Sequence, residues 1–385
     1  MKLMNTALGL ILAKLGGSPF YVRFHVTHRC NYRCRMCGQH RTSSERTGEL
    51  PLSAIRAVAE RIARMRAYHI VITGGEPFLR PDLPDVIAAF RQHNLSIRVQ
   101  TNGGPQVTSQ MLAQCARAGL CDISVSLDTL NPSLQDEICQ SRRVVDHALR
   151  TMQLGQQLLP HGISQANIVA SAYNFAELPD LVRFFYHRGM YTYITPVMIE
   201  RGHATGRSFR FRGQDASFKP EDMDADVCHR ILDELIGLRR LGFGLTNSTR
   251  YLRDYKSYLT NGQSSWRCEA GILTLDILPD GSVCPCKEKP PIGNILDEGF
   301  PQYYRSPAYL QRVRKITSAC QGCFYGEYRE PQYALHDPSV LQEWVRGWFC
   351  TFRRGMRFNR AMKSERWTNT VACSPSAAHG DPKKG

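Results

Sequence analysis

The sequence predicts an α/β fold in which six parallel strands alternate with helices and curve into a partial barrel. Six short runs rich in apolar and β-branched residues are separated by amphipathic stretches of helical period. Parallel strands need a crossover helix between them, so this alternation indicates right-handed βαβ units. Glycine-containing polar motifs directly follow several of the runs, where α/β barrels carry their chemistry.

The expected elements follow the chain in a regular order. The six strands are expected at Tyr21–Val26, His69–Thr73, Ser96–Thr101, Asp122–Leu127, Asn167–Ala172 and Tyr191–Pro196. The helices between them are expected at Leu52–Met65, Leu83–His93, Ser109–Ala118, Val144–Leu158 and Ala176–His187. A further helix is expected at Asp226–Leu241, and the chain is expected to become helical again after Tyr333.

The bulk composition indicates a globular protein with metal sites. The chain has 385 residues, 42% hydrophobic and 22% charged, and no apolar run approaches the roughly 20 residues of a membrane span. Fourteen cysteines include two tight groups, and no secretory signal is evident. This pattern favours metal ligands in a reducing compartment over disulfides, so we expect a cytoplasmic protein.

The chain is strongly basic, with a formal net charge of +15. Such a charge is compatible with nucleic acid, an anionic membrane surface, or an acidic substrate or partner. The charge alone does not choose among these classes.

Three cysteines, Cys30, Cys34 and Cys37, lie in eight residues just after the first expected strand. Three thiolates at this spacing can hold three irons of a 4Fe–4S cube and leave the fourth iron open to a ligand that is not protein. A disulfide framework and a zinc site, with His28 or His40 as fourth ligand, are the alternatives.

This spacing resembles the radical S-adenosylmethionine (SAM) superfamily, and further motifs extend the resemblance in order along the chain. It covers roughly the first 200 residues and resumes at Cys268, through the segments Thr73–Pro77, Thr101–Gly103, Ser124–Asp128 and Ile168–Asn174. Each of these motifs alone would be weak, but their order makes the combination specific.

The resemblance implies a set of cofactors and binding residues. Cys30, Cys34 and Cys37 would ligate a 4Fe–4S cluster whose open iron holds SAM. The residues expected to bind SAM are Gly74, Gly75, Glu76 and Pro77 at its amino group, Ser126 and Asp128 at its ribose, and Asn174 at its adenosine. A plain β-turn and an ordinary strand end are the alternatives for the first two groups.

The resemblance also implies the reaction. One electron enters SAM and yields a 5′-deoxyadenosyl radical, which abstracts hydrogen from the substrate. A one-electron reductant such as flavodoxin or ferredoxin is the expected partner.

A second group of cysteines contains Cys268, Cys284, Cys286, Cys320 and Cys323. Pro279-Asp280-Gly281 within it predicts a hairpin turn. The group resembles the auxiliary-cluster module called twitch, a short form of SPASM. The resemblance assigns Cys268, Cys286, Cys320 and Cys323 to one auxiliary 4Fe–4S cluster. Cys284 shares a strand face with Cys286 and is the alternative ligand, and a zinc ribbon is the alternative site.

These observations divide the chain into five parts. An N-terminal helix (residues 1–19) precedes the radical SAM core barrel (20–200), a basic linker and helix (201–262), the twitch/SPASM-like auxiliary domain (263–335), and a basic amphipathic helix with a disordered tail (336–385). The last helix is expected to close over the barrel. Peripheral contact with an anionic membrane is the second interpretation.

The fold class is thus a partial (β/α)6 radical SAM barrel with a small C-terminal auxiliary-cluster domain. The resemblance to twitch enzymes favours oxidation or rearrangement of a small molecule, with an electron passed to the auxiliary cluster. The alternative is a maturase that modifies a ribosomally synthesised peptide. The ordered SAM motifs argue against a non-catalytic nucleic-acid-binding metalloprotein.

Overall fold

The computed structural model of the chain describes residue 13 and residues 17–38, 48–160, 162–198, 215–219, 223–261, 267–320 and 323–347. Most of the expected N-terminal helix, most of the basic linker and the C-terminal tail lie outside these residues, as does His40.

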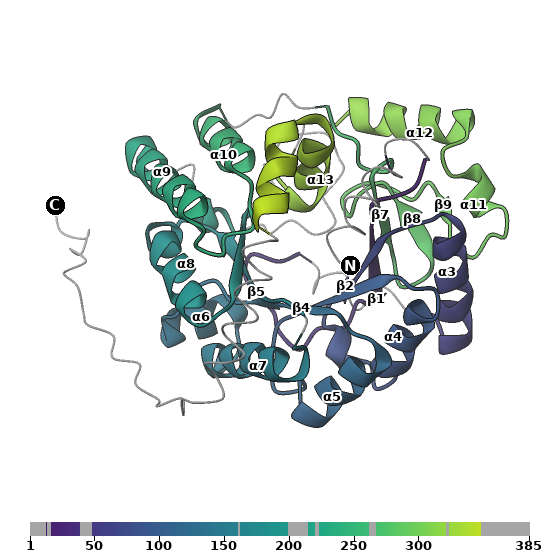
Figure 1. Cartoon of the computed structure of the whole chain (residues 1–385), viewed down its shortest axis with the longest axis horizontal. Coiled ribbons are helices and arrows are strands. Elements are labelled where there is room, and N and C mark those ends of the chain that lie inside the picture. Colours follow the sequence, from purple (N-terminus) through teal and green to yellow (C-terminus); the bar gives the residue numbers. More distant parts are fainter. Residues whose placement is uncertain are drawn as a thin grey trace.

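The barrel sheet is parallel and is built from six strands in chain order, as Figure 1 shows. These strands are β1 (Tyr21–Thr27), β2 (His69–Gly74), β3 (Ser96–Thr101), β4 (Asp122–Ser126), β5 (Ser164–Ala170) and β6 (Tyr191–Pro196). Each strand pairs in parallel with the next, so their carboxyl ends lie at one end of the barrel. The predicted fold class is confirmed.

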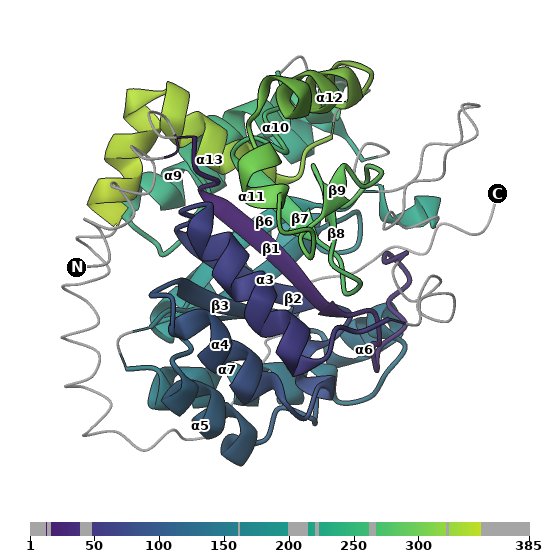
Figure 2. The same cartoon turned by 90° about the vertical axis from the view of Figure 1, so that its right-hand side faces the viewer.

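Helices cover the outer face of this sheet (Figures 1 and 2). They are α3 (Leu52–Arg64), α4 (Leu83–Arg91), α5 (Ser109–Ala118), α7 (Val144–Leu158) and α8 (Leu178–His187). Short 3₁₀ turns precede α4, α8 and α9, at Pro77–Leu79, Phe175–Glu177 and Ala216–Phe218. Helix α5 illustrates the local signals: the Thr108 side chain accepts a hydrogen bond from the Met111 N–H, and Gly119 ends the helix at φ 107°.

Most barrel elements match their predicted bounds to within two residues, and the larger differences are at β5 and α6. Strand β5 begins at Ser164, three residues before the predicted start. The prediction missed its first residues because they are polar, and Gln165 lines the barrel interior. Helix α6 (Pro132–Cys139) was not predicted. Asn131 caps it by accepting from the Leu134 N–H, and Pro132 occupies its first turn.

The C-terminal unit extends the same sheet from the other edge of β1. Strand β7 (Thr274–Ile277) pairs in parallel with β1, and β8 (Ser282–Cys284) and β9 (Gly293–Asn294) follow it in antiparallel order. The turn between β7 and β8 has Gly281 at φ 83°, as the Pro-Asp-Gly signal predicts. Helices α11 (Phe300–Tyr303) and α12 (Pro307–Ser318) lie beside this hairpin (Figure 2).

Helices α9 (Ala225–Leu241), α10 (Thr249–Asn261) and α13 (Gly326–His336) lie together over the barrel edge near β6 (Figure 1). Tyr251 and Tyr255 of α10 pack on Phe324, with ring centroids 4.8 and 5.2 Å away. Helix α13 starts at Gly326, well before the predicted return to helix after Tyr333, and it contains Pro331, a residue that usually disfavours a helix interior.

Residues 338–347 are helical and pack on the barrel. The rings of Trp344 and Phe20 lie 6.3 Å apart, and Val340 is fully buried. This part of the chain therefore behaves as a terminal helix that closes over the barrel. The arginine-rich continuation of the expected helix, from residue 348, lies outside the described residues.

Helix α13 brings a buried carboxyl group, Glu330, to the barrel interior. Its Oε1 accepts a hydrogen bond of 2.8 Å from the Ser248 N–H, and among the described residues its Oε2 has no hydrogen-bond partner. Burial raises the pKa of Glu330 from 4.5 to about 7. The folded protein therefore keeps this proton at a pH where the unfolded chain has released it.

We predict that Glu330→Gln removes one pH-dependent part of the protein's stability. From about pH 4.5 to about pH 7 only the unfolded chain releases the proton, so stability falls by about 1.4 kcal/mol per pH unit and then levels off. The variant and the unchanged protein should unfold at similar temperatures at pH 5, and the variant at a higher temperature at pH 8. Exposed Glu60 of α3 supplies the control, because Glu60→Gln should not change the pH dependence. Parallel curves for Glu330→Gln and the unchanged protein would contradict this.

Candidate functional site

The three-cysteine loop leaves the carboxyl end of β1 and is held by backbone hydrogen bonds from two sides. The Gly75 and Glu76 N–H groups donate to the carbonyls of Thr27 and Arg29, at 2.9 and 2.8 Å. On the other side, the Arg35 N–H donates to the Ile138 carbonyl of α6 at 2.9 Å. The loop is thus fixed between the glycine motif and α6.

Cys30, Cys34 and Cys37 converge at one end of the barrel cavity. Burial raises the pKa of the Cys30 thiol to about 11. The Cys34 thiol has a pKa well above its usual range, first because of its hydrogen bond with Cys139 and then because of burial, and Cys37 and Cys30 add to the shift. Thiols in this setting become ligands when a bound cation stabilises their thiolates.

The glycine motif approaches the cysteine loop so closely that no side chain fits between them. A Cβ built on Gly74 would lie 2.3 Å from the Thr27 carbonyl oxygen, and one on Gly75 would lie 2.0 Å from that of Arg29. Gly74 also has φ 140°, which favours glycine. Both glycines line the cavity beside the cysteines, as expected for backbone that contacts a ligand.

Glu76 and Pro77 support this loop from behind. The carboxylate of Glu76 is fully buried and accepts from the Phe78 N–H, the Thr101 hydroxyl and the Asn102 N–H, at 2.9, 2.8 and 2.7 Å. Burial raises the pKa of Glu76 to about 7, and these hydrogen bonds limit the rise. Glu76 therefore ties the ends of β2 and β3 together.

Of the residues expected to contact the nucleoside of SAM, two line the cavity and the third does not. Ser126 and Asp128 line the cavity at the end of β4. The Asp128 carboxylate accepts from the Val169 N–H at 2.8 Å, and burial raises its pKa to about 6. Asn174 is buried and donates to the carbonyls of Asp128 and Val169, so its amide fixes the β4 and β5 ends rather than facing the cavity. The assignment of these residues to SAM stays a prediction.

Four of the auxiliary cysteines influence one another electrostatically. Burial raises the pKa of the Cys268 thiol to about 12, and the nearby Cys323 and Cys320 add to the shift. Burial likewise raises the pKa of Cys286, and Cys323 and Cys268 add to it. Cys284 is fully buried in β8. The assignment of these cysteines to one cluster stays a prediction.

Both cysteine groups supply reduced thiols, which are the donors that iron–sulfur clusters take. In the described part of the chain, no three His, Cys, Asp or Glu side chains lie close enough to hold one metal ion. The chemistry of the donors therefore fits the clusters that the resemblance implies.

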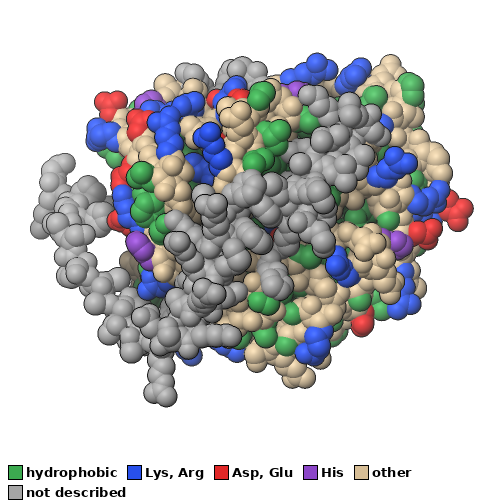
Figure 3. All heavy atoms as spheres, viewed as in Figure 1, with side chains coloured by type: hydrophobic (Ala, Val, Ile, Leu, Met, Phe, Trp, Pro, Cys, Tyr) green, Lys and Arg blue, Asp and Glu red, His purple; other side chains and the backbone are tan. Residues whose placement is uncertain are grey.

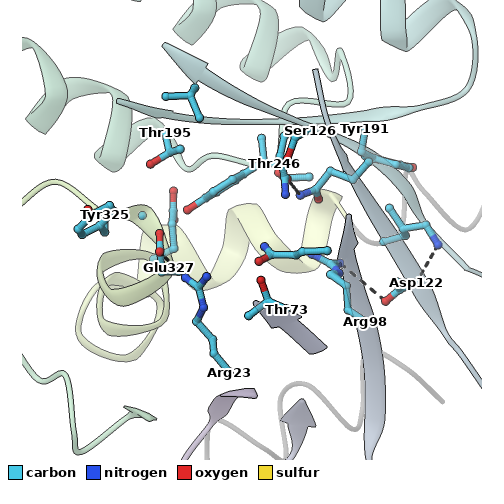
Figure 4. Close-up of a pocket in the computed structure, with 18 of the residues that line it drawn as sticks. Arg23, Thr73, Arg98, Asp122, Ser126, Tyr191, Thr195, Thr246, Tyr325 and Glu327 are labelled. Atoms are coloured by element: carbon cyan, nitrogen blue, oxygen red, sulfur yellow. Dashed lines mark hydrogen bonds and ion pairs between the residues drawn. The ribbon is translucent and has the colours of Figure 1, made fainter. Parts of the chain in front are cut away.

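A cavity of about 2000 Å³ extends from the three-cysteine loop through the barrel interior. Side chains at alternate positions of the strands point into it, and most are polar or aromatic with a polar tip (Figure 4). They include Tyr21, Arg23, Thr73, Arg98, Gln100, Ser126, Gln165, Asn167, Tyr193 and Thr195. A barrel interior is usually filled by branched apolar side chains, so the polar groups spaced along this wall are available to hydrogen-bond a ligand.

A buried ion-pair network joins the cavity wall to the auxiliary cysteines. Glu327 of α13 pairs with Arg23 of β1 and, at 3.0 Å, with Lys287, which follows Cys286 (Figure 4 shows Arg23 and Glu327). Burial alone would raise the pKa of Glu327, but Lys287 and Arg23 outweigh it and lower the pKa to about 2. Sequence reasoning missed this network, because Arg23 lies 304 residues from Glu327 in the chain.

Behind this network, Asp276 of β7 accepts from the Tyr328 hydroxyl at 2.8 Å and pairs with His25 of β1 at 2.9 Å. Burial lowers the pKa of His25 and favours its neutral form. Strands β1 and β7 and helix α13 are thus joined by one continuous polar network.

In the view of Figure 3, Lys and Arg side chains lie along the upper edge, where Figure 1 places α9, α10 and α12, and others lie on the right and in the lower part. No helix in the described ranges is long and apolar enough to cross a bilayer.

Two family models match the chain. The model of the radical SAM superfamily matches residues 24–185, and the SPASM model, an iron–sulfur cluster-binding domain, matches residues 268–324. The matched segments contain the two cysteine groups described above.

Curated relatives match over different lengths. The GTP 3′,8-cyclase of Acidothermus cellulolyticus is 32% identical over 177 residues, which are 42% of this chain and 47% of that protein. The chain thus spans about half of that relative. The mycofactocin maturase MftC of Mycobacterium tuberculosis is 25% identical over 323 residues, which cover 80% of this chain and 76% of the maturase.

Solved structures share the fold at low sequence identity. Streptococcus suis SuiB bound to precursor peptide SuiA has a TM-score of 0.60 and 14% identity, over 83% of this chain and 75% of SuiB. The enzyme anSMEcpe with bound AdoMet and Cp18Cys peptide has a TM-score of 0.56 and 13% identity, over 85% of this chain and 99% of its own.

We predict that Gly75→Ala weakens SAM binding by at least about tenfold, because the new methyl group cannot fit against the Arg29 carbonyl and the loop must move. Equilibrium dialysis of SAM against the anaerobically reconstituted protein measures this. Gly237→Ala in α9 is the matched control, since nothing lies within 4 Å of its added methyl group. It should keep SAM affinity and gain about 0.5–1 kcal/mol of helix stability. Equal SAM affinity in both variants would contradict the assignment.

We also predict that Cys286→Ser removes about four irons per chain, whereas Cys284→Ser leaves the iron content unchanged. The reason is the electrostatic influence of Cys323 and Cys268 on Cys286. Iron and sulfide analysis after reconstitution measures it. Iron loss in Cys284→Ser alone would reverse the assignment.

Proposed function

Because the chain is a radical SAM superfamily enzyme with a C-terminal SPASM iron–sulfur domain, we propose that it uses SAM-dependent radical chemistry to modify a peptide. Its cofactors are SAM, the SAM-binding 4Fe–4S cluster and the iron–sulfur centre of the SPASM domain.

The observation that carries the proposal is the polar cavity inside the barrel. Its volume of about 2000 Å³ exceeds the roughly 300–1,000 Å³ of common small-molecule pockets, although SAM and the cluster would occupy part of it. Amide, hydroxyl and phenol groups along its wall suit the hydrogen-bonding groups of a peptide backbone. Lys287, which follows Cys286, lines the same space, so a bound segment can extend from the three-cysteine loop toward the auxiliary cysteines.

The relatives favour a peptide over a small molecule. The maturase MftC matches over most of both chains, including the C-terminal unit, whereas the GTP cyclase matches only over 42% of this chain. In SuiB, which shares the fold, a precursor peptide is bound. The small-molecule oxidation that the sequence favoured is therefore the weaker interpretation, and the maturase alternative is the stronger one.

The chain's own residues would divide the work between the two ends of the cavity. Cys30, Cys34 and Cys37 would hold the first cluster, with the backbone of Gly74 and Gly75 against SAM. When bound, these cofactors supply a radical that abstracts hydrogen from the substrate. The barrel walls would orient the substrate and exclude water from the reacting atoms.

At the other end, Cys268, Cys286, Cys320 and Cys323 would hold an auxiliary cluster that accepts the electron left on the substrate. Lys287 and Arg23 place positive charge between that cluster and the cavity. A one-electron donor of the flavodoxin or ferredoxin kind is the proposed partner for the first cluster.

We predict that the anaerobically reconstituted protein, with dithionite and SAM, forms 5′-deoxyadenosine and changes the mass of a peptide encoded beside its gene. The reason is that hydrogen abstraction and substrate oxidation take place in one cavity. Mass spectrometry of the peptide and chromatography of the nucleoside measure the two products. The triple variant Cys30→Ala, Cys34→Ala, Cys37→Ala should form neither.

The single variant Cys286→Ser separates the cleavage of SAM from the modification of the peptide. It should retain formation of 5′-deoxyadenosine and lose most of the peptide product. If 5′-deoxyadenosine forms while every neighbouring peptide stays unmodified and a small molecule is consumed, the peptide proposal is wrong.

A further inference from the structure

Arg98 occupies a distinctive position inside the barrel. It is the third residue of β3, where Ser96, Arg98 and Gln100 line the cavity while the alternating Ile97 and Val99 are buried against the helices. Figure 4 shows its side chain extending into the space enclosed by the strands.

The guanidinium of Arg98 is incompletely satisfied. Among the described residues, its buried Nε has no hydrogen-bond partner, and its nearest carboxylate contact is Asp122 Oδ2 at 3.7 Å from Nη2. The other oxygen of Asp122 accepts from the Ile163 N–H at 2.8 Å, which holds the carboxylate at the start of β4. A distance of 3.7 Å is too long for a hydrogen bond.

Arg23, the neighbouring arginine of the cavity, also has an Nε without a hydrogen-bond partner among the described residues, 3.6 Å from Asp276. Its Nη1, however, pairs directly with Glu327, which also holds Lys287. Arg23 therefore belongs to a network that is internal to the protein, whereas Arg98 keeps donors for a ligand.

We propose that Arg98 binds a carboxylate of the substrate and so anchors it in the barrel. A guanidinium presents a planar pair of donors that matches a carboxylate, and an unmet buried donor gains most from such a partner. This inference rests on the proposed function for the nature of the substrate.

The position of Arg98 on its strand sets the distance between the bound carboxylate and the carboxyl end of the barrel. Three residues separate it from Thr101 at the carboxyl end of β3, which is about 10 Å at 3.3 Å per residue. An extended peptide covers about the same distance in three residues. The hydrogen atom that is abstracted should therefore belong to a residue about three positions from the bound carboxylate.

Two sources can supply this carboxylate, the C-terminus of a peptide or an acidic side chain within it. A phosphate is disfavoured because Asp122 lies 3.7 Å from the Arg98 guanidinium and would repel its second negative charge. The group that Arg98 would recognise is a carboxylate, and three probe peptides distinguish its two sources.

The probes are acetylated trialanine with a free C-terminal carboxylate, the same peptide as its amide, and an amidated peptide whose central residue is glutamate. Saturation-transfer NMR with the reconstituted full chain, over millimolar concentrations, measures their binding. The unchanged protein should bind at least one carboxylate probe in preference to the neutral amide. The preferred probe identifies the source.

Arg98→Met should weaken binding of the preferred carboxylate probe by about tenfold or more and leave binding of the amide unchanged. Arg98→Lys, which keeps the charge but loses the planar pair of donors, should bind this probe with an affinity between those of Arg98→Met and the unchanged protein. Exposed Arg117 of α5 is the control, and Arg117→Met should bind all probes as the unchanged protein does. Circular dichroism and iron content confirm that each variant folds.

The proposal is wrong if the unchanged protein binds the amide as well as it binds both carboxylates, a comparison that needs no variant. It is also wrong if folded Arg98→Met keeps the preference. These outcomes are independent of catalysis, so Arg98-dependent binding with no peptide modified would instead indicate a small carboxylic acid as substrate.

Discussion

The structure depends on β1, which forms hydrogen-bonded pairs along both of its edges. One edge pairs with β2 of the barrel and the other with β7 of the C-terminal unit, both in parallel. The same strand leads directly into the three-cysteine loop. The two cysteine groups therefore belong to one continuous sheet, and their separation is set by strand geometry rather than by a flexible linker.

One face of β1 is apolar and packs in the core, and the other face is polar and contacts the C-terminal unit. Val22, Phe24 and Val26 are buried in the apolar core. The alternating residues Arg23 and His25 pair with Glu327 and Asp276 of the C-terminal unit. Breaking a buried charge pair costs far more than the pair contributes, so these contacts oppose any movement of α13 away from the barrel.

The sequence predicts the barrel well because its outer face follows simple rules. Strands β3 and β6 and helices α5 and α7 have their predicted bounds, since apolar period and helix caps decide them. The convergence of the cysteines also follows from motif order and strand ends. Prediction fails at two features that face the cavity, the polar start of β5 and the ion pairs of Glu327. Both belong to the polar interior of the barrel and not to an apolar pattern. A run of polar residues at alternate strand positions, such as Ser96, Arg98 and Gln100, is the signal that would have revealed this interior.

The carboxyl groups of α13 show how charge is distributed within the cavity. Glu327 and Glu330 are three residues apart, yet the pKa of Glu327 is about 2 and that of Glu330 about 7. The difference arises because Lys287 and Arg23 surround Glu327, whereas burial dominates at Glu330. Charge is thus balanced around Glu327, beside the auxiliary cysteines. At Arg98 the nearest carboxylate lies 3.7 Å away, so a charged group of the proposed substrate would gain most from binding there. Under the proposed function, recognition and redox chemistry would therefore belong to different parts of the barrel wall.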